Sequence, residues 1–195
     1  DVAPSRGLGD VYKRQTLKKY MIFFMMIIII WPISVLADSA KSSVVMDLDS
    51  GRVMYQKDMN QKRLIASTTK IMTAIVAIEN GELTKKIKVG KEVLSMYGTN
   101  IYVEVGESMR LKDLLYGLLL RSGNDASVVI AKAVAGSEEK FVNMMNDKAK
   151  EIGMKNTIFK NPHGLDEKTE NYSTAYDMAC LLYTSPSPRD GATSR

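Results

Sequence analysis

The stretch from Thr68 to Asn80 constrains the fold most strongly, because a helix built from it is apolar on nearly every side. Its apolar residues are Ile71, Met72, Ala74, Ile75, Ala77 and Ile78. Their spacing fits a helical period, and Asn80-Gly81 is typical of a helix end. A helix that is apolar all round is buried. The sequence therefore predicts a central helix around which other elements pack.

Further helices are predicted by the patterns that follow. They cover residues 111–120, 126–135 and 138–152, and a last helix begins at Ser173, which has the composition of an N-cap. Residues 42–58 hold two β-prone runs around Asp49-Ser50-Gly51, which predicts a hairpin, and residues 84–105 alternate loosely, as short strands and loops do. With 195 residues and 45% hydrophobic content, the chain is long and apolar enough for one domain with a sizeable core.

The two ends are interpreted as non-native. One DNA string encodes Ser5 to Gln15, and its reverse complement encodes Cys180 to Asp190, a relation that two unrelated protein segments do not share by chance. The string also resembles a sequencing-library adapter. Residues 1–15 and 180–195 are therefore left out of the fold prediction. The sole cysteine, Cys180, falls in the second segment, so cysteine usage says nothing about the redox compartment.

Residues 16–37 have the pattern of a secretory signal peptide. Lys18 and Lys19 precede a short apolar run that ends in Val35-Leu36-Ala37, where small residues favour cleavage after Ala37. The alternative is an uncleaved anchor, although the run is shorter than the ~20 residues of a membrane span. Residues 38–179 then form the exported domain.

Net charge gives little support for nucleic-acid binding. The formal charge of +5 belongs mostly to the two ends and to Lys18 and Lys19. The remaining charges are nearly balanced and scattered along the chain, without a basic block.

Ser67 and Lys70 are the first candidates for chemistry. Three positions apart on a helix, they share a face, so the amine reaches the hydroxyl. A buried lysine loses basicity, and lowering its pKa from ~10.4 to about 7 or 8, roughly 4 kcal/mol, makes it a base for a serine nucleophile. Unpaired N–H groups at the helix start suit an oxyanion. The alternative is that Ser67 caps the helix and Lys70 extends to solvent.

Ser122-Gly123-Asn124 lies between two predicted helices, where a loop brings a hydroxyl and a carboxamide toward a cleft. Alternatively, it is a simple helix-breaking turn. Ser-x-x-Lys followed by Ser-x-Asn forms the first two elements of the penicillin-recognising serine enzyme signature.

Three segments carry a family resemblance: "IASTTKIMTA", "LLYGLLLRSGNDAS" and "NPHGLD" with "YSTAYDMA". From about Ser39 to Ala179 the chain resembles the D-alanyl-D-alanine carboxypeptidases, the low-molecular-mass penicillin-binding proteins of peptidase family S11. The resemblance implies an α/β fold of the α+β type, β-lactamase/transpeptidase-like, in which an antiparallel sheet packs with a helical cluster. It also implies an exported enzyme of the bacterial cell envelope that needs no cofactor.

The resemblance assigns roles to the candidate residues. Ser67 attacks the bond between two terminal D-alanines of a peptidoglycan stem peptide and forms an acyl-enzyme, with Lys70 as its base. Ser122 relays a proton to the leaving amine, and Asn124 hydrogen-bonds the substrate backbone. β-Lactams acylate Ser67 as substrate mimics, and membrane association arises through the leader or a C-terminal anchor.

One family element is missing. The Lys-Thr-Gly strand is absent, and Lys168-Thr169-Glu170 does not replace it because it lacks the glycine and lies in a polar loop. We expect the C-terminal strands to be missing as well, leaving a hydrophobic sheet edge. The 195-residue chain is therefore expected to show little activity, in contrast to its intact parent.

His163, the sole histidine, is predicted to order the turn-rich loop "NPHGLD" rather than to form a Ser-His triad. A lone histidine without a carboxylate cluster also argues against a zinc site, and the methionines are interpreted as core residues. Two alternatives for function remain. One is a serine β-lactamase or D,D-endopeptidase, and the other is a non-catalytic penicillin-binding sensor or wall-binding module.

Overall fold

The computed structural model describes residues 18–26, 39–166 and 169–184. The chain divides into two units, residues 1–39 and residues 40–195. Residues 18–26 of the first unit are helical and exposed. Within the described ranges, no helix has the length and apolarity needed to span a bilayer. The first predicted non-native segment, the cleavage site after Ala37 and the last residues of the second segment, from 185 onward, lie outside the described residues.

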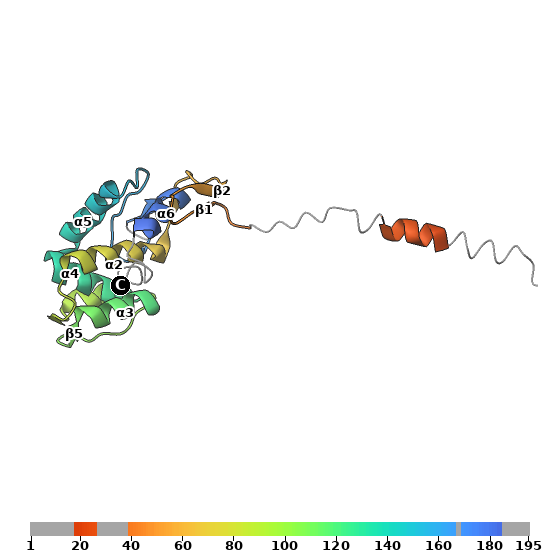
Figure 1. Cartoon of the computed structure of the whole chain (residues 1–195). Helices are drawn as coiled ribbons and strands as arrows, with labels where there is room; N and C mark the ends of the chain where they lie inside the picture. The colour runs from red at the N-terminus through yellow and green to blue at the C-terminus, as the bar shows by residue number, and fades with distance from the viewer. Residues whose placement is uncertain (1–17, 27–38, 167–168, 185–195) are drawn as a thin grey trace, which may run out of the picture. The chain divides into compact units, whose positions relative to one another are not determined.

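Helix α2 (Thr69–Asn80) is the central helix of the second unit, as predicted. It packs against α3 (Leu111–Leu120), α4 (Asn124–Ala135) and α5 (Glu138–Glu151), and Figure 1 shows it running between α5 and α3. Its core residues Met72, Val76 and Ala77 are at most 1% exposed. The apolar surface is not covered on every side, however, because Ile78 remains 48% exposed.

The strands pair in three separate two-stranded antiparallel sheets. The pairs are β1 (Ser43–Met46) with β2 (Val53–Lys57), β3 (Arg63–Leu64) with β6 (Tyr172–Ser173), and β4 (Lys86–Lys88) with β5 (Ser108–Arg110). The first pair is the predicted hairpin. Its turn is closed by Asp47, whose carboxylate accepts the Ser50 N–H at 2.8 Å, and by Gly51 at a φ of 67°. The antiparallel pairing was predicted, but its division into short pairs was not.

Two short 3₁₀ helices complete the fold: η1 (Ala66–Thr68), which leads directly into α2, and η2 (Lys91–Ser95). Helix α5 is capped by Ser137, the residue before its first turn, whose hydroxyl accepts the Lys140 N–H. At the end of α4, Gly136 adopts a left-handed φ of 81°, which a glycine takes without strain.

The last helix, α6 (Ala175–Thr184), starts later than predicted. Its first turn is capped by Thr174, whose hydroxyl accepts the Asp177 N–H at 3.1 Å. Ser173 is not the cap, because it belongs to β6 and its hydroxyl pairs with that of Thr157 at 2.7 Å. Helix α6 includes residues 180–184 of the predicted non-native segment, and Leu181 is fully buried in the core.

Candidate active site

Ser67 lies in a tight turn at the entrance to α2. It is the second residue of η1 and is exposed to solvent. The preceding residue, Ala66, has a positive φ of 44°, which is uncommon for a residue with a side chain. Gly164, at a φ of 84°, packs so closely that a Cβ there would overlap the Ala66 carbonyl. This loop contact holds the strained backbone just before Ser67, and strain of this kind is frequent at functional sites.

Lys70 extends from the first turn of α2 toward Ser67. Its Nζ lies 3.1 Å from Ser67 Oγ and donates to the carbonyl oxygen of His163 at 2.8 Å. The side chain is buried, with only 2% of the residue exposed, so the alternative that it extends into solvent is wrong. Burial lowers the pKa of Lys70 to about 8. About one molecule in ten therefore holds a neutral amine at pH 7.

Ser122 and Asn124 lie at the junction of α3 and α4. Ser122 has a left-handed φ of 57°, so its backbone, like that of Ala66, is in a conformation that is uncommon for a residue with a side chain. Asn124 was predicted to be in the loop, but it is the first residue of α4, because the helix starts two residues earlier than its apolar pattern indicates. No hydrogen bond of the described residues joins Ser122 or Asn124 to the Ser67–Lys70 pair.

The start of α4 is held by residues 97–103, a contact that was not predicted from the sequence. Asn124 donates its Nδ2 to the Tyr97 carbonyl at 2.7 Å and its backbone N–H to the Thr99 carbonyl at 2.8 Å. Asp125 accepts the N–H groups of Ile101 and Val103 at 3.0 and 3.2 Å. It also accepts the N–H of Ala126 at 2.8 Å, and because Asp125 is only 2% exposed, this carboxylate anchors the segment in the interior. In the sequence, the signal for this anchor is an acidic residue directly after Ser-x-Asn, at the start of an apolar helix.

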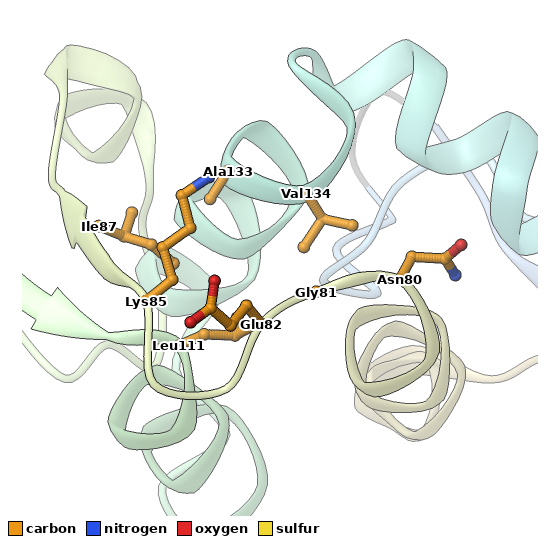
Figure 2. A pocket seen from close by; sticks show the side chains of 8 residues that line it. All are labelled: Asn80, Gly81, Glu82, Lys85, Ile87, Leu111, Ala133 and Val134. Carbon is orange, nitrogen blue, oxygen red and sulfur yellow. The ribbon is translucent and has the colours of Figure 1, made fainter.

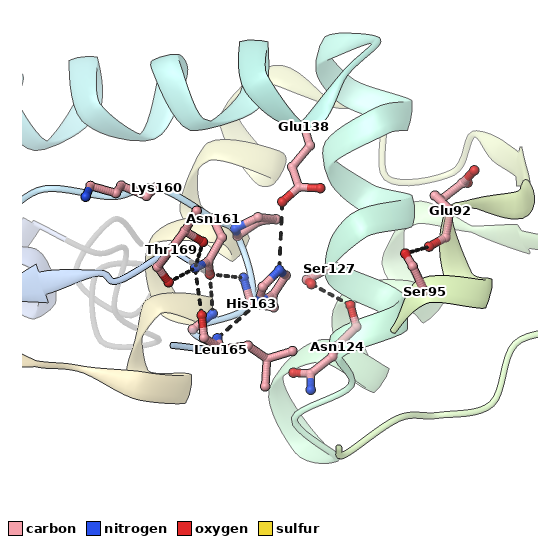
Figure 3. Close-up of polar contacts among 12 residues, drawn as sticks. Glu92, Ser95, Asn124, Ser127, Glu138, Lys160, Asn161, His163, Leu165 and Thr169 are labelled. Atoms are coloured by element: carbon pink, nitrogen blue, oxygen red, sulfur yellow. Dashed lines mark hydrogen bonds and ion pairs between the residues drawn. The ribbon is translucent and has the colours of Figure 1, made fainter. Parts of the chain in front are cut away.

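His163 orders its loop, as predicted. Its Nδ1 accepts the Leu165 N–H at 3.0 Å, and its Nε2 lies 3.8 Å from Glu138 (Figure 3). Burial, with a smaller contribution from the positive charge of Lys70, lowers the pKa of His163 to about 4. The imidazole is therefore neutral at physiological pH. Its ring has no hydrogen bond to Ser67, and it is the backbone carbonyl of His163, rather than the ring, that accepts from Lys70.

A cavity of about 250 Å³ lies beside this loop. Its lining residues are Ser95, Met96, Tyr97, Glu138, His163, Leu165 and Thr169, most of which are drawn in Figure 3. Tyr97 and His163 are the residues whose carbonyls receive Asn124 and Lys70, so the cavity borders both halves of the site.

A second cavity of about 250 Å³ lies at the other end of α2, lined by residues that include Asn80, Glu82 and Lys85 (Figure 2). Ten residues separate Lys70 from Asn80, about 15 Å along a helix. None of the predicted site residues lines this cavity. In the described part of the chain, no group of three or more histidine, cysteine or acidic residues is gathered as metal ligands would be.

Comparison with known proteins gives consistent matches. A family model described as D-alanyl-D-alanine carboxypeptidase, Peptidase_S11, matches residues 33–188. The D-alanyl-D-alanine carboxypeptidase DacF of Bacillus subtilis is 47% identical over 153 residues, which cover 76% of this chain and 39% of DacF. The D-alanyl-D-alanine endopeptidase of Escherichia coli is 36% identical over 146 residues, covering 74% of this chain and 46% of that protein.

A solved structure agrees with these matches. The D-alanyl-D-alanine carboxypeptidase DacD of Francisella tularensis superposes with a TM-score of 0.71 at 38% identity, covering 75% of this chain and 37% of that one. The predicted fold class, a helical cluster with antiparallel strands as in penicillin-binding proteins, is confirmed. The chain spans about two fifths of the length of the first curated relatives it matches.

Proposed function

Because the chain belongs to the D-alanyl-D-alanine carboxypeptidase family of serine peptidases, S11, we propose that Ser67 is the nucleophile of such an enzyme. In this proposal, the full-length protein that contains this chain removes the terminal D-alanine from peptidoglycan stem peptides. The observation that carries the proposal is the 3.1 Å approach of a buried lysine amine to an exposed serine hydroxyl. A serine needs a neighbouring base to act as a nucleophile, and Lys70 is within reach.

In the proposed reaction, neutral Lys70 takes the Ser67 hydroxyl proton while Oγ bonds to the carbonyl carbon of the D-alanyl-D-alanine bond. The Ser67 N–H, in the first turn of the helical segment, donates to the developing oxyanion. The proton passes from Lys70 through Ser122 to the departing amine, and D-alanine leaves. Water then attacks the acyl carbon and gives its proton to Lys70. Lys70 passes that proton to Ser67 Oγ as the bond between Oγ and the acyl carbon breaks, which releases the shortened peptide and restores Ser67.

Asn124 is the proposed substrate-binding residue. Its Nδ2 already donates to the Tyr97 carbonyl, which fixes the orientation of the carboxamide. The carboxamide oxygen then serves as the acceptor for a substrate N–H. The role of Ser122 is supported by its left-handed backbone, a strained conformation of the kind found at functional sites.

Export, signal-peptide cleavage and cell-envelope location are parts of the same proposal. They are supported by the charged and apolar pattern of residues 16–37 and by the extracytoplasmic site of peptidoglycan. We further infer that residues 38–179 are part of a longer serine peptidase domain, whose remaining strands supply the Lys-Thr-Gly element. Membrane association through the leader or a C-terminal anchor also belongs to this proposal.

The test compares the 195-residue chain with the full-length gene product. Both are incubated with a fluorescent penicillin, and D-alanine release from a pentapeptide is measured. Labelling and release by the full-length protein, abolished in Ser67→Ala, are expected. An unlabelled full-length protein contradicts the proposal, and a Ser67→Ala variant that still binds penicillin indicates a non-catalytic sensor.

A second activity is favoured by one comparison, the match to the endopeptidase of Escherichia coli. The same acyl transfer at Ser67 would then cleave a D-alanyl cross-link. A cross-linked muropeptide dimer, tested beside the pentapeptide, separates the two activities by their product. Turnover of free penicillin identifies a β-lactamase instead.

A further inference from the structure

Two buried asparagines, Asn161 and Asn171, organise the loop that reaches the catalytic lysine. Both are at most 1% exposed. Asn161 lies two residues before His163, whose carbonyl accepts from Lys70, and Asn171 lies immediately before β6. A buried amide is costly unless both its donor and acceptor groups are satisfied. Their hydrogen bonds therefore show what the fold holds in place.

Asn171 bridges helix α2 and the loop. Its Nδ2 donates to Thr69 Oγ1 at 2.9 Å and to the Asn161 carbonyl at 3.0 Å. Its Oδ1 accepts the N–H groups of Lys160 and Asn161 at 2.7 and 3.2 Å. Thr69 is the neighbour of Lys70, so one side chain ties the turn carrying the base to the loop that contacts it.

Asn161 continues this connection within the loop (Figure 3). Its Oδ1 accepts the N–H groups of His163 and Gly164 at 3.2 and 2.6 Å. Its Nδ2 donates to the carbonyls of Leu165 and Thr169, both at 3.0 Å. Because the N–H groups of His163 and Gly164 are bound to Asn161, the orientation of this turn is fixed, and the His163 carbonyl points toward Lys70 Nζ.

We propose that Asn171, acting through Asn161, is a positioning residue for the catalytic base: it keeps the His163 carbonyl on Lys70 Nζ and keeps water out. The inference rests on the proposed function. A neutral amine has two N–H groups and one lone pair. When one N–H is given to a fixed carbonyl, rotation of the amine is restricted, and the lone pair is held toward Ser67.

The electrostatic surroundings make the loop important for basicity. Burial is the cause of the lowered pKa of Lys70. On the loop, the titratable group facing it is His163, whose own pKa is lowered in part by Lys70. On α5, Glu138 lies 3.8 Å from the Nε2 of that imidazole. On α4, the Asp125 carboxylate accepts three backbone N–H groups, those of Ile101, Val103 and Ala126. Loosening the loop admits water and so raises the pKa of Lys70.

The experiment measures the rate of acylation by a fluorescent penicillin against pH in the full-length gene product. Asn171→Leu removes the bridge but keeps the branched shape and the number of heavy atoms of the side chain. Thr69→Val removes only the hydrogen bond between Asn171 and α2. Asn146→Leu is the matched control. Asn146 makes the same kind of amide clamp, donating to the Phe159 carbonyl at 2.8 Å and accepting the Phe159 N–H at 2.9 Å, but it holds the segment to α5.

We expect the acidic limb of the rate profile to move to higher pH in Asn171→Leu. In Thr69→Val it should move in the same direction by a smaller amount. A rise of one pKa unit reduces the neutral amine, and with it the rate at pH 7, about tenfold. Asn146→Leu should lose stability but keep the limb in place. If Asn171→Leu does not fold, the position of the acidic limb in Thr69→Val tests the inference.

Two results overturn the inference: an unmoved limb in the folded bridge variants, or an equal shift in Asn146→Leu. Either result requires that the wild-type protein be acylated. A wild-type protein that is not labelled instead contradicts the proposed function itself, so the two failures are distinguishable.

Discussion

The amine of Lys70 donates to the backbone carbonyl of His163, 93 residues further along the chain, while the same nitrogen lies 3.1 Å from Ser67 Oγ. The end of the Lys70 side chain is therefore held by the main chain of a distant loop. Its position does not depend on α2 alone.

The first prediction concerns the pH dependence of acylation. Because only neutral Lys70 accepts a proton, the rate in the full-length protein should rise with pH to a midpoint near 8, the pKa that burial gives this amine. Well below the midpoint, each pH unit changes the neutral fraction about tenfold. Lys70→Arg should remove acylation at every pH, since arginine stays charged. A flat profile, or an active Lys70→Arg variant, contradicts lysine as the base.

The second prediction concerns stability. The pKa of Lys70 is lowered from 10.5 to about 8 in the folded chain, so between these values the unfolded chain holds more protons. Stability contributed by Lys70 therefore increases as pH rises through this window. Relative to Lys70→Met, the wild-type protein should gain at most about 3 kcal/mol between pH 7 and pH 10.5. Urea unfolding of both proteins at several pH values measures this gain, and a pH-independent difference would count against a buried amine.

The third prediction concerns Gly164. An alanine here suffers a left-handed φ of 84° and a Cβ that overlaps the Ala66 carbonyl. Gly136→Ala is the matched control, with a φ of 81° and no atom within 4 Å of its Cβ. The control should lose about 1 kcal/mol from backbone strain alone. Gly164→Ala should lose about 2 kcal/mol more and acylate more slowly. Equal losses in urea unfolding would show that the loop does not press on the Ser67 turn.

The fourth prediction concerns Asp125. Asp125→Asn replaces one acceptor oxygen with an NH₂ group that faces a backbone N–H, so either Ile101 or Val103 loses its partner. The expected cost is about 2 kcal/mol, with slower acylation because the segment around Tyr97 also orients Asn124. Asp113→Asn is the control, since Asp113 pairs with Arg110 on the surface, where solvent screening leaves such pairs with little effect on stability. Similar losses in both variants contradict the anchoring role.

Local patterns predicted much of the fold. Helices α2 and α3, and the β1–β2 hairpin, were predicted because helical periodicity and turn composition are encoded within a few residues. The start of α4 at Asn124 and the cap at Thr174 were missed, since each depends on polar contacts rather than on apolar spacing. The division into three short sheets also depends on long-range packing.

The Ser67–Lys70 pair was predicted from a spacing of three residues, which a helix converts directly into a contact. The supporting residues Asp125, Asn161 and Asn171 were not predicted. Asn171 acts on Thr69, 102 positions earlier, and Asp125 acts on residues 22 and 24 positions earlier. Contacts over such separations leave no periodic signal in a single sequence.

The main-chain contact to Lys70 also has an evolutionary consequence. Every residue carries a backbone carbonyl, so the contact with Lys70 does not by itself require an imidazole at position 163. The pressure falls instead on the neighbours that shape the path of the chain, Gly164 and Asn161. In distant descendants, we expect Gly164 and Asn161 to be retained for the contact with Lys70, whereas the ring at position 163 is constrained instead by its own bond to the Leu165 N–H.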